Sequence, residues 1–167
     1  MSRAPEVEDL VTDRLLLRAW TPDEIDAVLN GGRLAHWASD FPAEGDQVIV
    51  GLIAGRPEWL TAWGHRRLVL RDSGVVVGSA GLFWPPEGGA LELGYGLVPS
   101  ARGRGYATEA VRALTAHALT APDVHTVHAR VDRANGPSVR VLERAGFAFA
   151  SAADEEQPVY TFQASRV

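Results

Sequence analysis

The chain has 167 residues, of which 46 % are apolar, and a formal net charge of −5, which suits one domain over residues 1–167 with a sizeable core. It contains no cysteine, so disulfides, thiol catalysis and cysteine-ligated metals are excluded, and no apolar run reaches the roughly 20 residues of a membrane span. The acidic balance argues against general nucleic-acid binding and favours a cationic substrate. Because Met1–Asp9 is polar and acidic, unlike a signal peptide, we expect a cytoplasmic protein with neither a membrane nor a nucleic-acid partner.

The first part of the chain predicts a strand, a helix and then a strand meander. Thr12–Ala19 is a short apolar run typical of a strand, and Thr21-Pro22-Asp23-Glu24 begins a helix with a capping hydroxyl, a proline and two acids. Residues 31–64 are irregular and predict one or two helices joined by loops. The three strands of the meander are predicted at Arg66–Arg71, Val75–Phe83 and Leu91–Val98, with turns between them.

The second part alternates helices and strands. Gly105–Thr120 has apolar residues at a helical period, and Val124–Val131 is β-branched and alternating, as in a strand. Pro137–Ala145 predicts a short helix, which begins with proline and is followed by Gly146 as its C-cap. Phe147–Ser151 and Val159–Gln163 predict two closing strands, so the order indicates a mixed α/β domain.

A glycine-rich turn joins the third meander strand to the following helix. Gly103 and Gly105 allow the backbone to turn tightly, and the first amides of the helix lie at the positive end of its dipole. Arg102 and Arg104 add positive charge, so the turn suits a pyrophosphate, although a tight loop without a ligand has the same pattern. A P-loop is excluded because the chain has no lysine, and a dinucleotide-binding turn would need a third glycine.

The segment Arg102-Gly103-Arg104-Gly105-Tyr106-Ala107 resembles the Arg/Gln-x-x-Gly-x-Gly/Ala signature of the GNAT N-acetyltransferases. Its continuation through Thr108, Glu109 and Ala110 resembles the RimJ/RimL-like branch, the ribosomal-protein N-terminal acetyltransferases. Three further stretches resemble that branch in the same order along the chain: residues 12–18, residues 78–81 and residues 135–147.

The resemblance implies a GNAT fold of the α/β (α+β) class. Its mixed, mostly antiparallel sheet of about seven strands would be flanked by about four helices and splayed between strands 4 and 5. Acetyl-CoA, as co-substrate and without a metal, would occupy the gap. The implied cofactor-binding residues are Leu97 and Val98 through their backbone, the amides of Arg102, Gly103, Arg104, Gly105, Tyr106 and Ala107, the Thr108 hydroxyl, and Asn135 and Ser138.

The proton-transfer residues are predicted on the same frame. Glu92 shares a strand face with two glycines, which leave room for a substrate, so Glu92 is the candidate base; the alternative is a solvent-facing glutamate. Leu142 stands where many family members have a tyrosine acid, so Ser138 is the substitute candidate, unless it serves only as a first-turn hydroxyl. Asn135 either caps that helix or binds pantetheine.

The acceptor is predicted from the free energy of deprotonation. At pH 7 this is roughly 1–1.4 kcal/mol for a terminal α-amine and about 4.6 kcal/mol for a lysine, which favours a protein N-terminal α-amine. The alternatives are a small-molecule amine, such as an antibiotic or metabolite, and a non-catalytic acyl-CoA-binding module. We expect Trp37, Trp59 and Trp63 to pack in the core, with the lining of an amine pocket as the alternative. A closed cleft lined by tryptophans would favour the small amine. The histidines have no metal-ligand spacing, and a homodimer and a larger acyl group are compatible with the same motifs.

Overall fold

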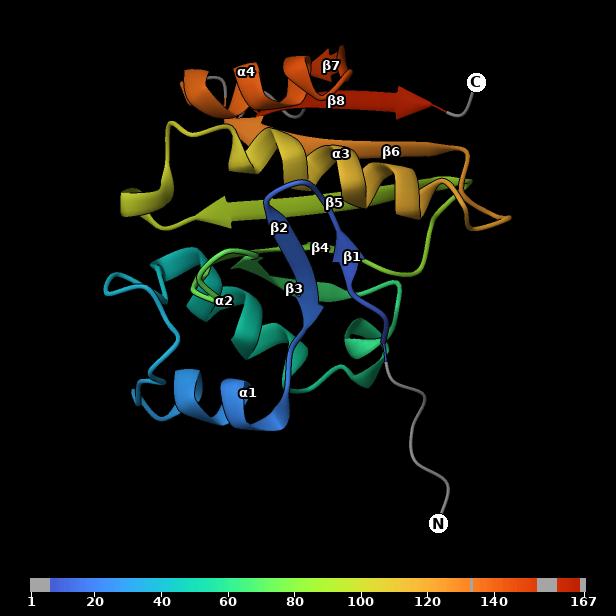
Figure 1. Ribbon diagram of the computed structural model, residues 1–167. Coiled ribbons are helices and arrows are strands. Elements are labelled where there is room, and N and C mark those ends of the chain that lie inside the picture. The colour runs from blue at the N-terminus through green and yellow to red at the C-terminus, as the bar shows by residue number, and fades with distance from the viewer. Residues whose placement is uncertain (1–6, 133, 153–158, 166–167) are drawn as a thin grey trace.

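The computed structural model describes residues 7–132, 134–152 and 159–165, and its strands form one mixed sheet (Figure 1). The eight strands lie in the order β1-β2-β3-β4-β5-β6-β8-β7. They are β1 (Leu10–Val11), β2 (Leu15–Ala19), β3 (His65–Leu70), β4 (Val76–Leu82), β5 (Ala90–Leu97), β6 (Thr126–Asp132), β7 (Ala148–Ala152) and β8 (Val159–Ser165). The helices are α1 (Pro22–Leu29), α2 (Glu44–Ile53), α3 (Tyr106–Ala118) and α4 (Gly136–Arg144), with 3₁₀ turns at Pro57–Leu60 and Pro99–Ala101.

The expected mixed sheet with four flanking helices is confirmed, with one strand more than expected. Leu10 and Val11 pair with Leu17 and Leu16, so a short edge strand precedes the first predicted one. The predicted strand over Thr12–Ala19 therefore begins only at Leu15, because the residues before it form the turn between β1 and β2. The added strand shifts the numbering, and the expected splay falls between β5 and β6.

The irregular stretch of residues 31–64 contains one α-helix and one 3₁₀ turn. Helix α2 begins with a side-chain cap, in which the Asp46 carboxylate accepts a hydrogen bond from the Ala43 amide at 2.9 Å. In Figure 1, α1 and α2 lie together at the end of the molecule opposite α4, β7 and β8. Within the described part of the chain, no helix has the length and apolar character that crossing a bilayer requires.

Strand β5 has two different neighbours along its length. Its second half, Leu93–Leu97, pairs antiparallel with Leu82–Gly78 of β4. Only its first residues, Ala90–Glu92, pair with β6, and this pairing is parallel. Beyond Glu92 the two strands part, so β5 keeps a sheet neighbour on one edge and opens on the other.

A buried charge cluster fixes the first helix to the sheet. Glu24 is 3 % exposed, and its carboxylate accepts hydrogen bonds from the Arg67 guanidinium at 3.0 Å and the Trp37 indole at 2.7 Å. His36 Nε2 lies 2.5 Å from the same carboxylate. The predicted helix start is also confirmed, since the Thr21 hydroxyl accepts from the Glu24 amide at 3.2 Å. Cap and cluster together set where α1 lies.

Replacing Glu24 by glutamine should lower the free energy of unfolding by about 3–5 kcal/mol, because the buried Arg67 guanidinium loses its counter-charge. Urea unfolding followed by tryptophan fluorescence measures this. The matched control is Asp26→Asn on the exposed face of the same helix, for which a change within about 0.5 kcal/mol is expected. Equal effects of the two substitutions would contradict the role of the cluster.

Candidate active site

A cavity of about 550 Å³ lies at the opening between β5 and β6. Its wall combines the start of α2, the open end of β5, the glycine-rich turn, the first turn of α3 and helix α4. The lining residues are Ala43, Gly45, Asp46, Tyr95, Gly96, Leu97, Arg102, Gly103, Gly105, Tyr106, Ala107, Thr108, Asn135, Pro137, Ser138, Arg140, Val141 and Arg144. Five structural elements thus meet at one hollow, which makes it the candidate active site.

The open edge of β5 forms one side of the cavity. Leu97 lines it, and its carbonyl accepts a hydrogen bond from Arg102 Nε at 3.1 Å. Val98, the other residue predicted to bind pantetheine, is fully buried and is not on the cavity wall. Its amide donates to the Val77 carbonyl at 2.9 Å, and its carbonyl accepts from Ala101 at 3.0 Å. The edge therefore offers an extended ligand the backbone before Val98, in the manner of strand addition.

The glycine-rich turn forms one end of the cavity. Gly103 and Gly105 have φ values of 77° and 83°, a left-handed conformation that favours glycine. Gly105 is the N-cap of α3 and supplies no side chain, so the first amides of the helix face outward to a ligand. The predicted residues from Arg102 to Thr108 all line the cavity except Arg104, which lies in the turn with an exposed side chain.

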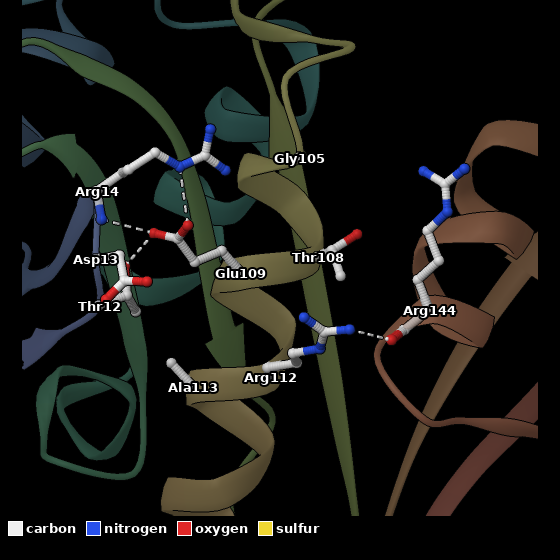
Figure 2. A pocket seen from close by; sticks show the side chains of 9 residues that line it. All are labelled: Thr12, Asp13, Arg14, Gly105, Thr108, Glu109, Arg112, Ala113 and Arg144. Carbon is white, nitrogen blue, oxygen red and sulfur yellow. Dashed lines mark hydrogen bonds and ion pairs between the residues drawn. The ribbon is translucent and has the colours of Figure 1, made fainter.

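The N-terminal motif holds this turn in place (Figure 2). The Glu109 carboxylate of α3 accepts hydrogen bonds from the Thr12 hydroxyl, from the Arg14 amide at 2.9 Å and from Arg14 Nε at 3.0 Å. Arg14 Nη1 also donates to the Arg104 carbonyl at 2.8 Å, and its guanidinium lies 4.5 Å from the Tyr106 ring centroid. The resemblance of residues 12–18 to one family branch thus has a structural meaning, because these residues position the turn and the start of α3.

A second hollow of about 700 Å³ continues from the first, with Gly105, Thr108 and Arg144 on the walls of both. Figure 2 shows Arg112 of α3 and Arg144 of α4 across this hollow, with the Thr108 hydroxyl pointing toward α4. Arg112 donates to the Arg144 carbonyl at 2.6 Å, and both residues line the hollow. Two guanidinium groups beside a helix N-terminus suit a ligand that carries several phosphates.

Helix α4 and its cap contain Asn135 and Ser138, the residues expected to lie near the thiol end of coenzyme A. The Asn135 side chain caps α4 by accepting from the Ser138 amide at 3.2 Å, and both residues line the cavity. The Tyr95 hydroxyl of β5 donates to the Ser138 carbonyl at 3.2 Å, and burial raises the pKa of that phenol. Leu142, in the position of the common family tyrosine, is fully buried. Tyr95 therefore places a neutral hydroxyl in the cavity that the sequence did not indicate.

Two carboxylates can be compared as proton acceptors. Glu92 lies where β5 still pairs with β6, with Oε1 4.0 Å from His128 Nε2, and it is not on the cavity wall. Asp46 is on the wall, although it is 3 % exposed. Sequence reasoning missed Asp46 because its helix falls in the irregular stretch of residues 31–64. The spacing Ala43-x-x-Asp46, with an acid three residues after a helix start, was the available signal.

The sequence predicts no metal site, because its histidines lack metal-ligand spacing. Among the residues that the structure describes, no three histidine, aspartate or glutamate side chains gather into a group that could hold a metal ion. The three tryptophans expected in the core are not on the wall of this cavity. Trp37 and Trp59 are buried, and Trp63 stacks between Trp84 and His117 with ring-centroid distances of 5.3 and 4.6 Å.

A family model described as an acetyltransferase (GNAT) domain matches residues 14–148. The chain therefore belongs to the GNAT acetyltransferase family. Two curated relatives are the uncharacterized N-acetyltransferases p20 of Bacillus licheniformis and YjdG of Bacillus subtilis, which are 30 % and 35 % identical over 81 residues. Each match covers 48 % of this chain and 46 % or 48 % of the relative, so the chain spans about half the length of these relatives.

Solved structures share the fold over nearly the whole chain. A Bordetella pertussis protein assigned to the GnaT family is 29 % identical, with a TM-score of 0.68 over 93 % of this chain and 98 % of that one. The ribosomal-protein α-N-acetyltransferase RimL, in complex with coenzyme A, is 18 % identical, with a TM-score of 0.64 over 95 % and 98 %. The aminoglycoside acetyltransferase AAC(6')-Ib, in complex with acetyl-CoA, is 19 % identical, with a TM-score of 0.65 over 92 % and 94 %.

Replacing Gly105 by alanine should weaken coenzyme A binding by about tenfold, because the left-handed conformation costs an alanine roughly 1–2 kcal/mol. The added Cβ would also lie 3.2 Å from Arg14 Nη2, in the contact that positions the turn. Isothermal titration calorimetry measures the affinity. Gly74→Ala is the matched control, since Gly74 has a φ of 75° in a turn away from the cavity and should change stability without changing affinity. Unchanged affinity in Gly105→Ala would contradict the assigned role.

The link between Glu109 and the N-terminal motif should depend on pH. Burial opposes ionisation of Glu109, but the hydrogen bonds from Thr12 and Arg14 and the charge of Arg14 together hold its pKa below the ordinary value. A lowered carboxyl pKa stabilises the fold above the unfolded-state pKa of about 4.3, and this contribution is lost as the pH falls through the lower folded-state value. Glu109→Gln should therefore lower Tm at pH 7, and the difference from wild type should shrink in acid. A difference that stays constant down to pH 3 would contradict this assignment.

Proposed function

We propose that this protein transfers the acetyl group of acetyl-coenzyme A directly to a primary amine, and that the amine is a protein N-terminal α-amine. The observation that carries the proposal is the cavity at the parting of β5 and β6, where an open strand edge, an anion-binding turn and a buried carboxylate meet. Family membership, and fold neighbours solved with coenzyme A or acetyl-CoA, support acetyl-coenzyme A as the donor.

The residues fit the donor along its length. The backbone of Gly96 and Leu97 lies on the cavity wall, where it suits the pantetheine arm. The α3 amides and the turn after Arg102 suit the pyrophosphate of coenzyme A. The second hollow, lined by Arg112 and Arg144, suits the third phosphate group of the same molecule. Arg102, Arg112 and Arg144 thus place positive charge beside the expected phosphate positions, although the net charge of the chain is −5.

The chemistry requires a neutral amine and a protonated leaving thiol. Around the open end of β5, Ser138 of α4 offers a hydroxyl, and the neutral Tyr95 hydroxyl, whose pKa is raised by burial, donates to the Ser138 carbonyl. The Ser138 hydroxyl is suited to donate a hydrogen bond to the departing sulfur. Leu142 is buried and has no proton to donate, so the common family acid is absent. If the protein proves inactive, this absence would favour the alternative function, a non-catalytic acyl-CoA-binding module.

The α-amine is favoured over other amines by two considerations. Its deprotonation at pH 7 costs roughly 3 kcal/mol less than that of a lysine, so a site with one buried carboxylate is sufficient. None of the tryptophans, all of which belong to the described residues, lines the cavity, so the aromatic pocket that would favour a small cationic amine is not formed by them. The fold alone does not select the acceptor, because its neighbours include both a ribosomal-protein and an aminoglycoside acetyltransferase.

Release of free coenzyme A from acetyl-CoA, measured with a panel of acceptors, tests the proposal. Peptides with a free N-terminus should be acetylated at least tenfold faster than the same peptides with a blocked N-terminus and one internal lysine. Aminoglycosides and simple metabolite amines complete the panel. Preferential transfer to an aminoglycoside would replace the α-amine by the small-molecule acceptor, and acetyl-CoA binding without turnover of any acceptor would favour the binding module.

A further inference from the structure

Asp46 is a buried carboxylate on the wall of the cavity. It belongs to the first turn of α2 and is 3 % exposed. One oxygen, Oδ1, accepts the Ser79 hydroxyl of β4 at 2.5 Å, and the other, Oδ2, accepts the Ala43 amide at 2.9 Å. A carboxylate has about four lone-pair sites, so these two bonds orient the group and leave acceptor capacity toward the cavity.

The carboxylate lies beside the open end of β5. Ser79 is the cross-strand partner of Gly96, so the two residues share a face of the sheet. Gly96 has no side chain, and a Cβ built there would meet no atom within 4 Å. The space above Gly96 is therefore open next to the Asp46–Ser79 pair, and it adjoins Leu97, at the predicted position of the thioester.

The environment of Asp46 suits a proton acceptor. Burial raises its pKa, while the hydrogen bonds from Ser79 and Ala43 oppose that rise. A carboxylate whose pKa is moved toward neutrality is a stronger base than an ordinary surface aspartate. The other titratable or charged groups on the cavity wall are Tyr95 of β5, Arg102 of the turn, and Arg140 and Arg144 of α4. None of these described residues forms an ion pair with Asp46, so its charge is available to an incoming ammonium.

We infer that Asp46, oriented by Ser79, binds the acceptor ammonium and takes its proton. This inference rests on the proposed acetyl transfer. The ammonium gives one proton to the Asp46 carboxylate, and the neutral amine nitrogen then forms a bond to the acetyl carbonyl carbon. The carbon–sulfur bond breaks, its electron pair leaves on the sulfur of coenzyme A, and the second nitrogen proton is transferred to that thiolate. Asp46 finally returns its proton to solvent, so the net products are the amide, the thiol and one proton.

Three substitutions test this role. Asp46→Asn keeps the size of the side chain and an oxygen that can accept the Ala43 amide, but removes the base. We expect kcat/KM to fall by about 10²–10⁴-fold while acetyl-CoA affinity, measured by calorimetry, and Tm remain close to wild type. Glu44→Gln, on the exposed side of the same helical turn, is the matched control and should leave kcat/KM unchanged. Glu92→Gln tests the base predicted from the sequence; a large loss there with a fully active Asp46→Asn would overturn the inference.

The pH profile separates a base from a structural residue. Ser79→Ala removes the hydrogen bond that lowers the pKa of Asp46, so the acidic limb of kcat/KM should move to higher pH. Asp46→Glu should restore part of the activity lost in Asp46→Asn. A structural role alone would change Tm and leave the acidic limb where it is in wild type, and that result would overturn the inference.

Two further measurements distinguish a wrong acceptor class from a wrong role for Asp46. Rates are measured with a tetrapeptide that has a free N-terminal serine and, separately, with an aminoglycoside, so a wrong acceptor class is visible in the wild-type protein. NMR titration of the Asp46 carboxyl in the coenzyme A complex needs no acceptor. A pKa clearly above the ordinary aspartate value of about 3.9 is expected. A pKa at or below that value would overturn the inference whatever the acceptor is.

Discussion

The parting of β5 from β6 is the constraint on which the rest of the structure depends. A strand inside a sheet normally uses both edges, yet beyond Glu92 β5 pairs only with β4. The backbone of the open half is kept extended by β4 on one side and is accessible on the other. Without this opening, the turn before α3, the cap of α4 and the start of α2 would not border a common cavity.

The remaining elements fix the two ends of that opening. At one end, Arg14 and Thr12 hold Glu109 of α3 and the Arg104 carbonyl, so residues about 90 positions apart in the chain set the orientation of the glycine-rich turn. At the other end, Ser79 of β4 and the Ala43 amide hold Asp46 of α2. Both arrangements use a carboxylate with several hydrogen bonds, but Glu109 is partly exposed and paired with an arginine, whereas Asp46 is buried without a counter-charge. Their pKa values consequently move in opposite directions.

Local sequence patterns predicted the elements that depend on local physics. The Thr21 cap, the helical period after Gly105 and the alternation in β6 gave the correct element types, with bounds that differ by a few residues. For residues 31–64 the sequence predicts one or two helices but not their bounds, because α2 is stabilised by packing of Val50 and Ile53 in the core and by the Asp46 cap rather than by a strong local signal. Val98 was predicted on the ligand side, but β4 and the following 3₁₀ turn use its backbone, a contact that only the sheet register shows.

The sequence by itself determined the family, the glycine-rich turn and the helix that follows it. These depend on glycines with special backbone conformations and on a helix start, and both are encoded within a few neighbouring residues. Only the tertiary structure decided which carboxylate reaches the cavity. Glu92 lies in the part of β5 that still pairs with β6, whereas Asp46 comes from a distant helix and reaches the open end of β5 through Ser79. The position of a side chain relative to a cavity depends on long-range pairing and packing, and the local sequence pattern does not contain that information.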